Sequence, residues 1–223
     1  MRRDQSARDD LFGGMRTVGL GEETLAEGAV VLRGFVGADS GPIFEAVQQV
    51  AASAPFRHMV TPGGHCMSVA MTNCGRAGWV TDIRGYRYDP LDPAGVRPWP
   101  AMPEILRQLA IRAASHAGFM RFDPDSCLIN RYEPGARLAL HQDKNERDFA
   151  QPIVSLSLGL PAIFLFGGQH RNERPRRIRL ESGDMVVWGG AARLAFHGIA
   201  PLADGDHSLT GRCRINLTFR KAL

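Results

Sequence analysis

The chain has 223 residues, of which 44% are hydrophobic and 22% are charged, and its formal net charge is +4. This length and composition are enough to bury one good core, so we expect a single domain. No apolar stretch approaches the roughly 18 residues of a membrane span and the N-terminus has no signal-like apolar region, which excludes a helical membrane protein.

The positive charge is carried almost entirely by arginine, since Lys144 and Lys221 are the only lysines. An arginine-rich chain of this kind favours contact with phosphate groups. The cysteines form no CxxC pair and no zinc spacing; they are Cys66, Cys74, Cys127 and Cys213. Reduced thiols in a cytoplasmic protein are the simplest interpretation.

Residues 1–24 are polar, charged and glycine-containing, so we expect a poorly ordered leader, followed by one domain over 25–223. GAVVLRGF (28–35) is typical of a strand. Apolar residues then recur at helical spacing from Ile43 to Ala51, and again in a second helix that begins at Pro103, with Gly118 as its stop signal.

The segment 55–101 lies between these helices and is rich in glycine, methionine, proline and aromatic residues. We expect an extended loop here, and loops of this length in a compact domain usually carry function.

From residue 126 onward, short strands alternate with turns. The strands are CLINRYEPG, RLALHQD, IVSLSLGL, AIFLFGG, RRIRLESGD, MVVWGG, RLAFHGI and RINLTFR. Regular strands separated by Gly, Pro, Asn and Asp predict a sandwich or barrel of the jelly-roll type over 126–220. The fold class is therefore mainly β with flanking helices (α+β).

Two histidines and an aspartate suggest a metal site. His141 and Asp143 would project from the same face of a strand, and His197 follows in AFHGI. Two imidazoles and one carboxylate form the facial triad of non-heme Fe(II) enzymes. Taken singly the signals are weak, because an H-x-D arises readily by chance and a buried neutral histidine is often satisfied by a backbone carbonyl.

The last strand carries polar residues on one face, namely Arg214, Asn216, Thr218 and Arg220. Asn130 and Tyr132 show the same alternation on an earlier strand. In isolation such a face is more often an ordinary half-exposed strand. Polar faces recurring on separate strands nevertheless suggest a lined cavity, and a planar guanidinium pairs well with the carboxylates of 2-oxoglutarate.

Several long strings together resemble the AlkB family of Fe(II)/2-oxoglutarate dioxygenases, most of all its bacterial members. The strings are LINRYEPGARLALHQDKNE, PIVSLSLGLPAIFLFGG, GDMVVWGG, LAFHGI and CRINLTFR, extended upstream by MVTPGGHCMSVAMTNCG and PWPAMP. The likeness covers roughly residues 25–220. Because these strings agree in order, the resemblance is more specific than any single motif.

The resemblance implies a double-stranded β-helix whose metal is held by His141, Asp143 and His197. It also implies that Arg214 binds the distal carboxylate of 2-oxoglutarate, with Asn130, Tyr132, Asn216 and Arg220 completing that pocket. The implied reaction consumes O2 and 2-oxoglutarate and removes methyl groups from 1-methyladenine and 3-methylcytosine as formaldehyde, leaving succinate and CO2. The implied partner is alkylated DNA, single-stranded or with a flipped base, bound by a monomer.

On this resemblance, 55–101 is a nucleotide-recognition lid. The implied substrate-binding residues are Thr61, Met71, Trp79, Tyr86, Lys144, Asn145 and Arg171. An aromatic side chain can stack on a flipped base, although Trp79 and Tyr86 would also suit simple packing of the lid. The other arginines of RNERPRRIR are expected to form a solvated face.

Two positions depart from the bacterial pattern: Asn145 stands where an acid is expected, and His65 where a tyrosine is expected in the TPGG loop. Both departures bear on base selectivity, and neither falls on a residue expected to hold iron or 2-oxoglutarate. Two alternatives stay open: a demethylase of RNA or tRNA bases, and a metal-holding jelly-roll that binds nucleic acid without turnover.

Overall fold

The computed structural model describes residues 21–223. Its helices are α1 (Ser40–Ser53) and α2 (Glu104–His116), with short 3-10 turns at Gly37–Asp39 and Gly190–Ala192. Its strands are β1 (Gly21–Ala26), β2 (Ala29–Arg33), β3 (Arg57–Val60), β4 (Cys66–Gly75), β5 (Gly78–Asp82), β6 (Gly85–Asp89), β7 (Leu91–Asp92), β8 (Arg97–Pro98), β9 (Ser126–Tyr132), β10 (Leu138–His141), β11 (Ile153–Gly159), β12 (Ala162–Phe166), β13 (Arg176–Leu180), β14 (Met185–Trp188), β15 (His197–Ile199) and β16 (Arg214–Arg220).

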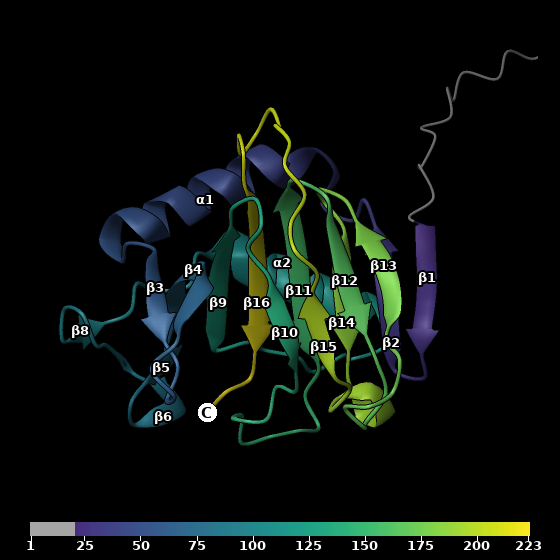
Figure 1. Ribbon diagram of the computed structural model, residues 1–223. Helices are drawn as coiled ribbons and strands as arrows, with labels where there is room; N and C mark the ends of the chain where they lie inside the picture. Colours follow the sequence, from purple (N-terminus) through teal and green to yellow (C-terminus); the bar gives the residue numbers. More distant parts are fainter. Residues whose placement is uncertain (1–20) are drawn as a thin grey trace, which may run out of the picture.

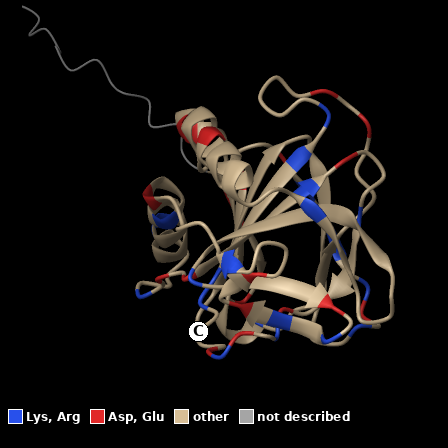
Figure 2. Ribbon diagram, turned by 90° about the vertical axis from the view of Figure 1, so that its left-hand side faces the viewer, with Lys and Arg blue, Asp and Glu red and all other residues tan. Residues whose placement is uncertain are grey.

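Two antiparallel sheets face each other. The larger sheet has eight strands in the order β1-β2-β14-β11-β16-β9-β4-β3, and the smaller has the order β10-β15-β12-β13. Figure 1 shows the smaller sheet in front of the larger one, and Figures 1 and 2 show both helices on the opposite side of the larger sheet. The mainly β class with flanking helices and jelly-roll sheets is thus confirmed.

The central strands β14, β11 and β16 of the larger sheet are buried on both faces because each face has its own apolar partner. Strand β16 illustrates this: Ile215, Leu217 and Phe219 pack in a cluster with buried residues of α1 and α2. The intervening polar residues of β16 face the smaller sheet, where a second cluster, including Phe164 and Trp188, fills the space between the sheets. The period-2 alternation of a strand thus separates a packing face from a polar face.

The expectation of an extended loop over 55–101 was wrong for much of that segment. Strands β3 and β4 belong to the larger sheet, with β4 paired to β9 along six residues from Ala70 to Gly75. Strand β4 reads CMSVAMTNCG, and methionine, alanine, asparagine and glycine are poor indicators of a strand. Burial between α1 and the second sheet, rather than local preference, accounts for this strand.

The predicted leader also ended too late. Residues 21–24 form part of β1, which pairs with β2 at the edge of the larger sheet; residues 1–20 lie outside the described part of the chain. The expected strand RLAFHGI is shorter than predicted, because only His197–Ile199 is extended. Among the helices of residues 21–223, none has the length and hydropathy that a membrane crossing requires.

The hairpin of β5 and β6 stands beside the open edge of the larger sheet and contacts β3, β4 and β9. In Figure 2, acidic and basic positions are intermixed on this side of the molecule.

Candidate active site

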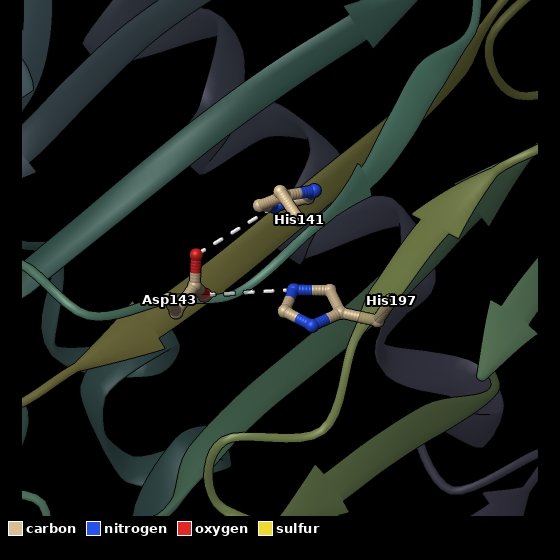
Figure 3. A group of neighbouring side chains, drawn as sticks. All are labelled: His141, Asp143 and His197. Carbon is tan, nitrogen blue, oxygen red and sulfur yellow. Dashed lines mark ion pairs between the residues drawn. The ribbon is translucent and has the colours of Figure 1, made fainter. Parts of the chain in front are cut away.

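His141, Asp143 and His197 converge between the two sheets. His141 ends β10 and His197 begins β15, and the two are direct partners in the antiparallel pair. Their ring centroids are 4.4 Å apart. A ligand atom from each of the three side chains lies within 4.8 Å of the others, and Figure 3 shows Asp143 facing both imidazoles. The expected three residues therefore form one group able to hold a metal ion.

A glycine lets β10 and β15 approach closely enough for this pairing. A Cβ at Gly198 would lie 2.6 Å from the carbonyl oxygen of Leu138, closer than real Cβ contacts. Any side chain at this position would push the two strands apart and separate the histidines.

Both histidines are oriented by backbone carbonyls. His141 Nδ1 lies 2.9 Å from the oxygen of Ala139, and His197 Nδ1 lies 3.0 Å from that of Ala195. Because a carbonyl only accepts, Nδ1 carries the proton in each ring and Nε2 is left to bind a metal. The Nε2 atoms of His141 and His197 lie 3.6 and 3.7 Å from the carboxylate of Asp143.

The protonation states suit a metal ligand set. Burial and the neighbouring His141 lower the pKa of His197 to about 4, so this imidazole is neutral at neutral pH. Burial would raise the pKa of Asp143, but the Arg220 guanidinium, which donates two hydrogen bonds to this carboxylate, holds that pKa well below its ordinary value. A neutral imidazole and an ionised carboxylate are the forms that coordinate metal.

A buried guanidinium that has no carboxylate partner among the described residues lies on the same cavity wall. Arg214 is 1% exposed, donates to Ser157 Oγ at 2.8 Å, and stacks over the ring of Tyr132 at 5.1 Å. Its Nε and Nη1 have no hydrogen-bond partner within residues 21–223. Burial lowers the pKa of Arg214 below its ordinary value. An unsatisfied buried charge is costly, and a bound carboxylate would satisfy it.

The pairing of β16 with β9 places further polar residues beside Arg214. Arg214 and Asn216 on β16 are opposite Tyr132 and Asn130 on β9. Asn216 receives a hydrogen bond from Asn130 and donates to Ser155 Oγ at 2.8 Å. The amide oxygen of Asn130 has no partner within residues 21–223 and remains free for a ligand.

Arg220, unlike the other residues expected to bind 2-oxoglutarate, makes hydrogen bonds to a residue of the metal group. Its guanidinium donates from Nε and Nη2 to Asp143 Oδ2, at 2.9 and 2.5 Å. Its Nη1 is buried and has no partner in the described chain. Arg220 therefore orients the carboxylate of the metal group as well as lining the cavity.

One cavity of about 940 Å³ joins all the site residues expected from the sequence. Its lining includes the metal group and the residues expected to bind 2-oxoglutarate. It also includes the expected substrate contacts, which are Thr61, Met71, Trp79, Tyr86, Lys144, Asn145 and Arg171. His65, which stands where the bacterial pattern has a tyrosine, lines the cavity as well. Met71 is 1% exposed and packs in the core, so it forms a wall rather than a mobile contact.

The aromatic pair of the hairpin is at the cavity rim. Trp79 and Tyr86 stack with centroids 5.6 Å apart and an interplanar angle of 22°, and Tyr86 is 48% exposed. Trp79 Nε1 donates to the amide oxygen of Asn145 at 3.2 Å. The sequence analysis missed Ser155 and Ser157, whose hydroxyls accept hydrogen bonds from Asn216 and Arg214. The alternation of serine with apolar residues in IVSLSLG was the signal that could have identified them.

Comparisons with known proteins agree with this geometry. The model of the 2OG-Fe(II) oxygenase superfamily matches residues 28–220. The chain is 58% identical to the alpha-ketoglutarate-dependent dioxygenase AlkB of Escherichia coli over 90% of this chain and 93% of that protein. It is 47% identical to the AlkB homolog of Caulobacter vibrioides over 81% and 80% of the two chains. The solved structure of OsALKBH1 superposes with a TM-score of 0.79 at 29% identity, covering 90% of this chain and all of that one.

Proposed function

This chain belongs to the 2OG-Fe(II) oxygenase superfamily and is an Fe(II)/2-oxoglutarate-dependent dioxygenase, and from this premise we propose that it repairs alkylated DNA by oxidative N-demethylation. The substrates are bases of the 1-methyladenine and 3-methylcytosine type, and the products are formaldehyde and succinate. The observation that supports this most strongly is that one cavity connects three converging metal ligands with the unpaired guanidinium of Arg214.

In this proposal His141, Asp143 and His197 hold Fe(II), which supplies the oxidising chemistry with O2 and 2-oxoglutarate when bound. The protein's residues position the reactants. Carbonyl-held Nδ1–H groups present both Nε2 atoms inward, and Arg214 binds a carboxylate of the co-substrate, with Asn130, Tyr132, Asn216 and Arg220 beside it.

The base enters over the rim of the cavity, where Trp79 and Tyr86 provide the stacking surface. Stacking of a flipped base on an aromatic side chain contributes about 1–3 kcal/mol. Thr61, Lys144, Asn145 and Arg171 are the polar contacts available to the nucleotide, and Met71 forms the apolar wall. We propose that the enzyme acts as a cytoplasmic monomer.

The experiment that tests this function measures succinate and formaldehyde with paired oligonucleotides that differ only by one methylated base. Turnover of methylated DNA with equal amounts of both products is expected. Matched RNA oligonucleotides would reveal a preference for RNA, because the 2′-OH distinguishes the two. Binding without either product would instead identify a nucleic-acid-binding jelly-roll.

Asn145 provides a test of base reading. An acid here would keep the acceptor for Trp79 and add a negative charge beside the base, whereas the present amide is neutral. We therefore expect Asn145→Asp to raise kcat/KM for cationic 3-methylcytosine relative to a neutral etheno adduct by about fivefold, equivalent to about 1 kcal/mol in a partly solvated site.

Both lesions are measured at matched pH and salt, and Asn172→Asp serves as the control because it adds the same charge on an exposed loop outside the cavity lining. Identical ratios in wild type and Asn145→Asp would remove Asn145 from the residues that read the base.

A further inference from the structure

A chain of polar contacts, partly buried at Tyr88 and fully buried at Glu146, connects the β5–β6 hairpin with Asp143. Tyr88 on β6 donates from its hydroxyl to Glu146 Oε1 at 2.5 Å. The Glu146 side chain is only 2% exposed and lies three residues after Asp143. The hairpin that carries the aromatic rim therefore reaches directly into the segment that follows the metal-binding strand.

Glu146 lies between two buried guanidiniums. Arg193 Nη2 donates to Glu146 Oε2 at 3.1 Å, and Arg220 Nε lies 3.4 Å from Oε1. Arg220 also holds Asp143 Oδ2. The desolvation cost of such buried ion pairs offsets much of their attraction, so their main effect is to fix geometry.

The same arginines fix both the backbone and the side chain of Asp143. Arg193 donates from Nη1 to the main-chain oxygen of Asp143 at 2.8 Å and from Nε to that of Gln151 at 2.9 Å. Arg220 contacts Oδ2 of the carboxylate and not Oδ1. Arg220 therefore orients this carboxylate, and it also forms an ion pair with Glu146, whose Oε1 lies 3.4 Å from its Nε.

The hairpin holds this segment at a second, adjacent point. Trp79 on β5 is the direct cross-strand partner of Tyr88, so both side chains project from one face of the hairpin. Trp79 binds Asn145 and Tyr88 binds Glu146. A shift of the hairpin is thereby transmitted to two consecutive residues beside Asp143.

We infer that Tyr88 and Glu146 are positioning residues that couple the hairpin to the metal carboxylate, so that nucleic-acid binding and metal binding strengthen each other. Coupling between two binding sites is reciprocal: if nucleic acid tightens the metal, the metal tightens nucleic acid by the same factor. The inference rests on the proposed function, because it takes the hairpin as the base-binding element and the triad as the metal site.

The test is a titration of the metal-free protein with Mn(II) alone, in the absence and presence of an unmethylated single-stranded oligonucleotide. For wild type, we expect the oligonucleotide to tighten Mn(II) binding by about fivefold. Glu146→Gln should weaken Mn(II) binding by about tenfold even without oligonucleotide, as is usual when a residue supporting a ligand is changed.

Tyr88→Phe separates positioning from packing, since the ring stays and only the hydroxyl is lost. It should leave Mn(II) affinity without oligonucleotide within about threefold of wild type but reduce the tightening by oligonucleotide to about twofold, with the remainder carried by Trp79 and Asn145. The control is Asp89→Asn, which weakens the ion pair with Arg87 inside the same hairpin at 3.3 Å without touching Glu146. It should keep the wild-type tightening.

Failure of the two proposals would look different. Wild-type Mn(II) binding that is absent, or unchanged by His141→Ala, would overturn the metal site itself. Triad-dependent Mn(II) binding with no tightening by oligonucleotide, or with the same tightening in Tyr88→Phe as in wild type, would overturn the coupling alone. If Glu146→Gln does not fold, as judged by circular dichroism, Tyr88→Phe alone decides.

Discussion

Replacing any one of His141, Asp143 and His197 by alanine should reduce formaldehyde release by at least about a thousandfold, because the metal performs the difficult step and needs all three ligands to stay in place. The three side chains share one small space, with ligand atoms within 4.8 Å of one another, so no described neighbour of suitable chemistry replaces a lost ligand. The measurement is turnover of a methylated oligonucleotide with Fe(II) added in excess.

The fold should largely survive these substitutions, since the apolar clusters on both sides of the larger sheet are untouched. His170→Ala is the matched control: its ring is exposed on a loop and does not line the cavity. Near wild-type turnover in any triad variant that is correctly folded would contradict the assignment of that residue as a ligand.

Arg214→Lys should raise the apparent KM for 2-oxoglutarate by about 10- to 100-fold, because a point charge does not reproduce the bidentate contact of a guanidinium with a carboxylate. The structure gives Arg214 one hydrogen bond, to Ser157, and leaves two of its nitrogens unsatisfied within residues 21–223. A shorter ammonium side chain would reach neither the same position nor the same geometry.

Thermal unfolding gives a second readout of the same contact. A ligand that binds only the folded state raises its stability, so 2-oxoglutarate should raise the Tm of wild type with Mn(II) and raise that of Arg214→Lys much less. Arg212→Lys is the control, since Arg212 is 67% exposed and pairs with Asp204 away from the cavity. An unchanged KM in Arg214→Lys would show that another residue binds the co-substrate.

Sequence patterns were most informative where a strand alternates strictly. RINLTFR separates apolar from polar residues at every step, and both the strand and its polar face could be predicted. Where both faces are buried among small or flexible residues, as in β4, local sequence carries little signal and the strand was missed. Strand β1 was missed because its residues GEETLA are mostly exposed at a sheet edge.

The site was predictable only in part, because some of its contacts join residues that are far apart in the sequence. Spacing placed His141 and Asp143 together, residue type and strand alternation made His197 and Arg214 candidates, and the resemblance joined the four into one site. The tertiary fold brings together Tyr88 and Glu146, which are 58 positions apart in the sequence, and Asp143 and Arg220, which are 77 positions apart. In the sequence, Glu146 and Arg193 look like ordinary charged surface residues; only their burial reveals their part in the site.

The alternation along β16 limits how this enzyme can vary. Each residue of Arg214–Arg220 is buried, and adjacent residues serve opposite sides of the sheet. Inserting or deleting one residue inside the strand would exchange the two sides, placing phenylalanine in the cavity between the sheets and arginine against the helices. The length of this segment is therefore fixed, and we expect insertions and deletions to be tolerated only in the connecting turns on either side.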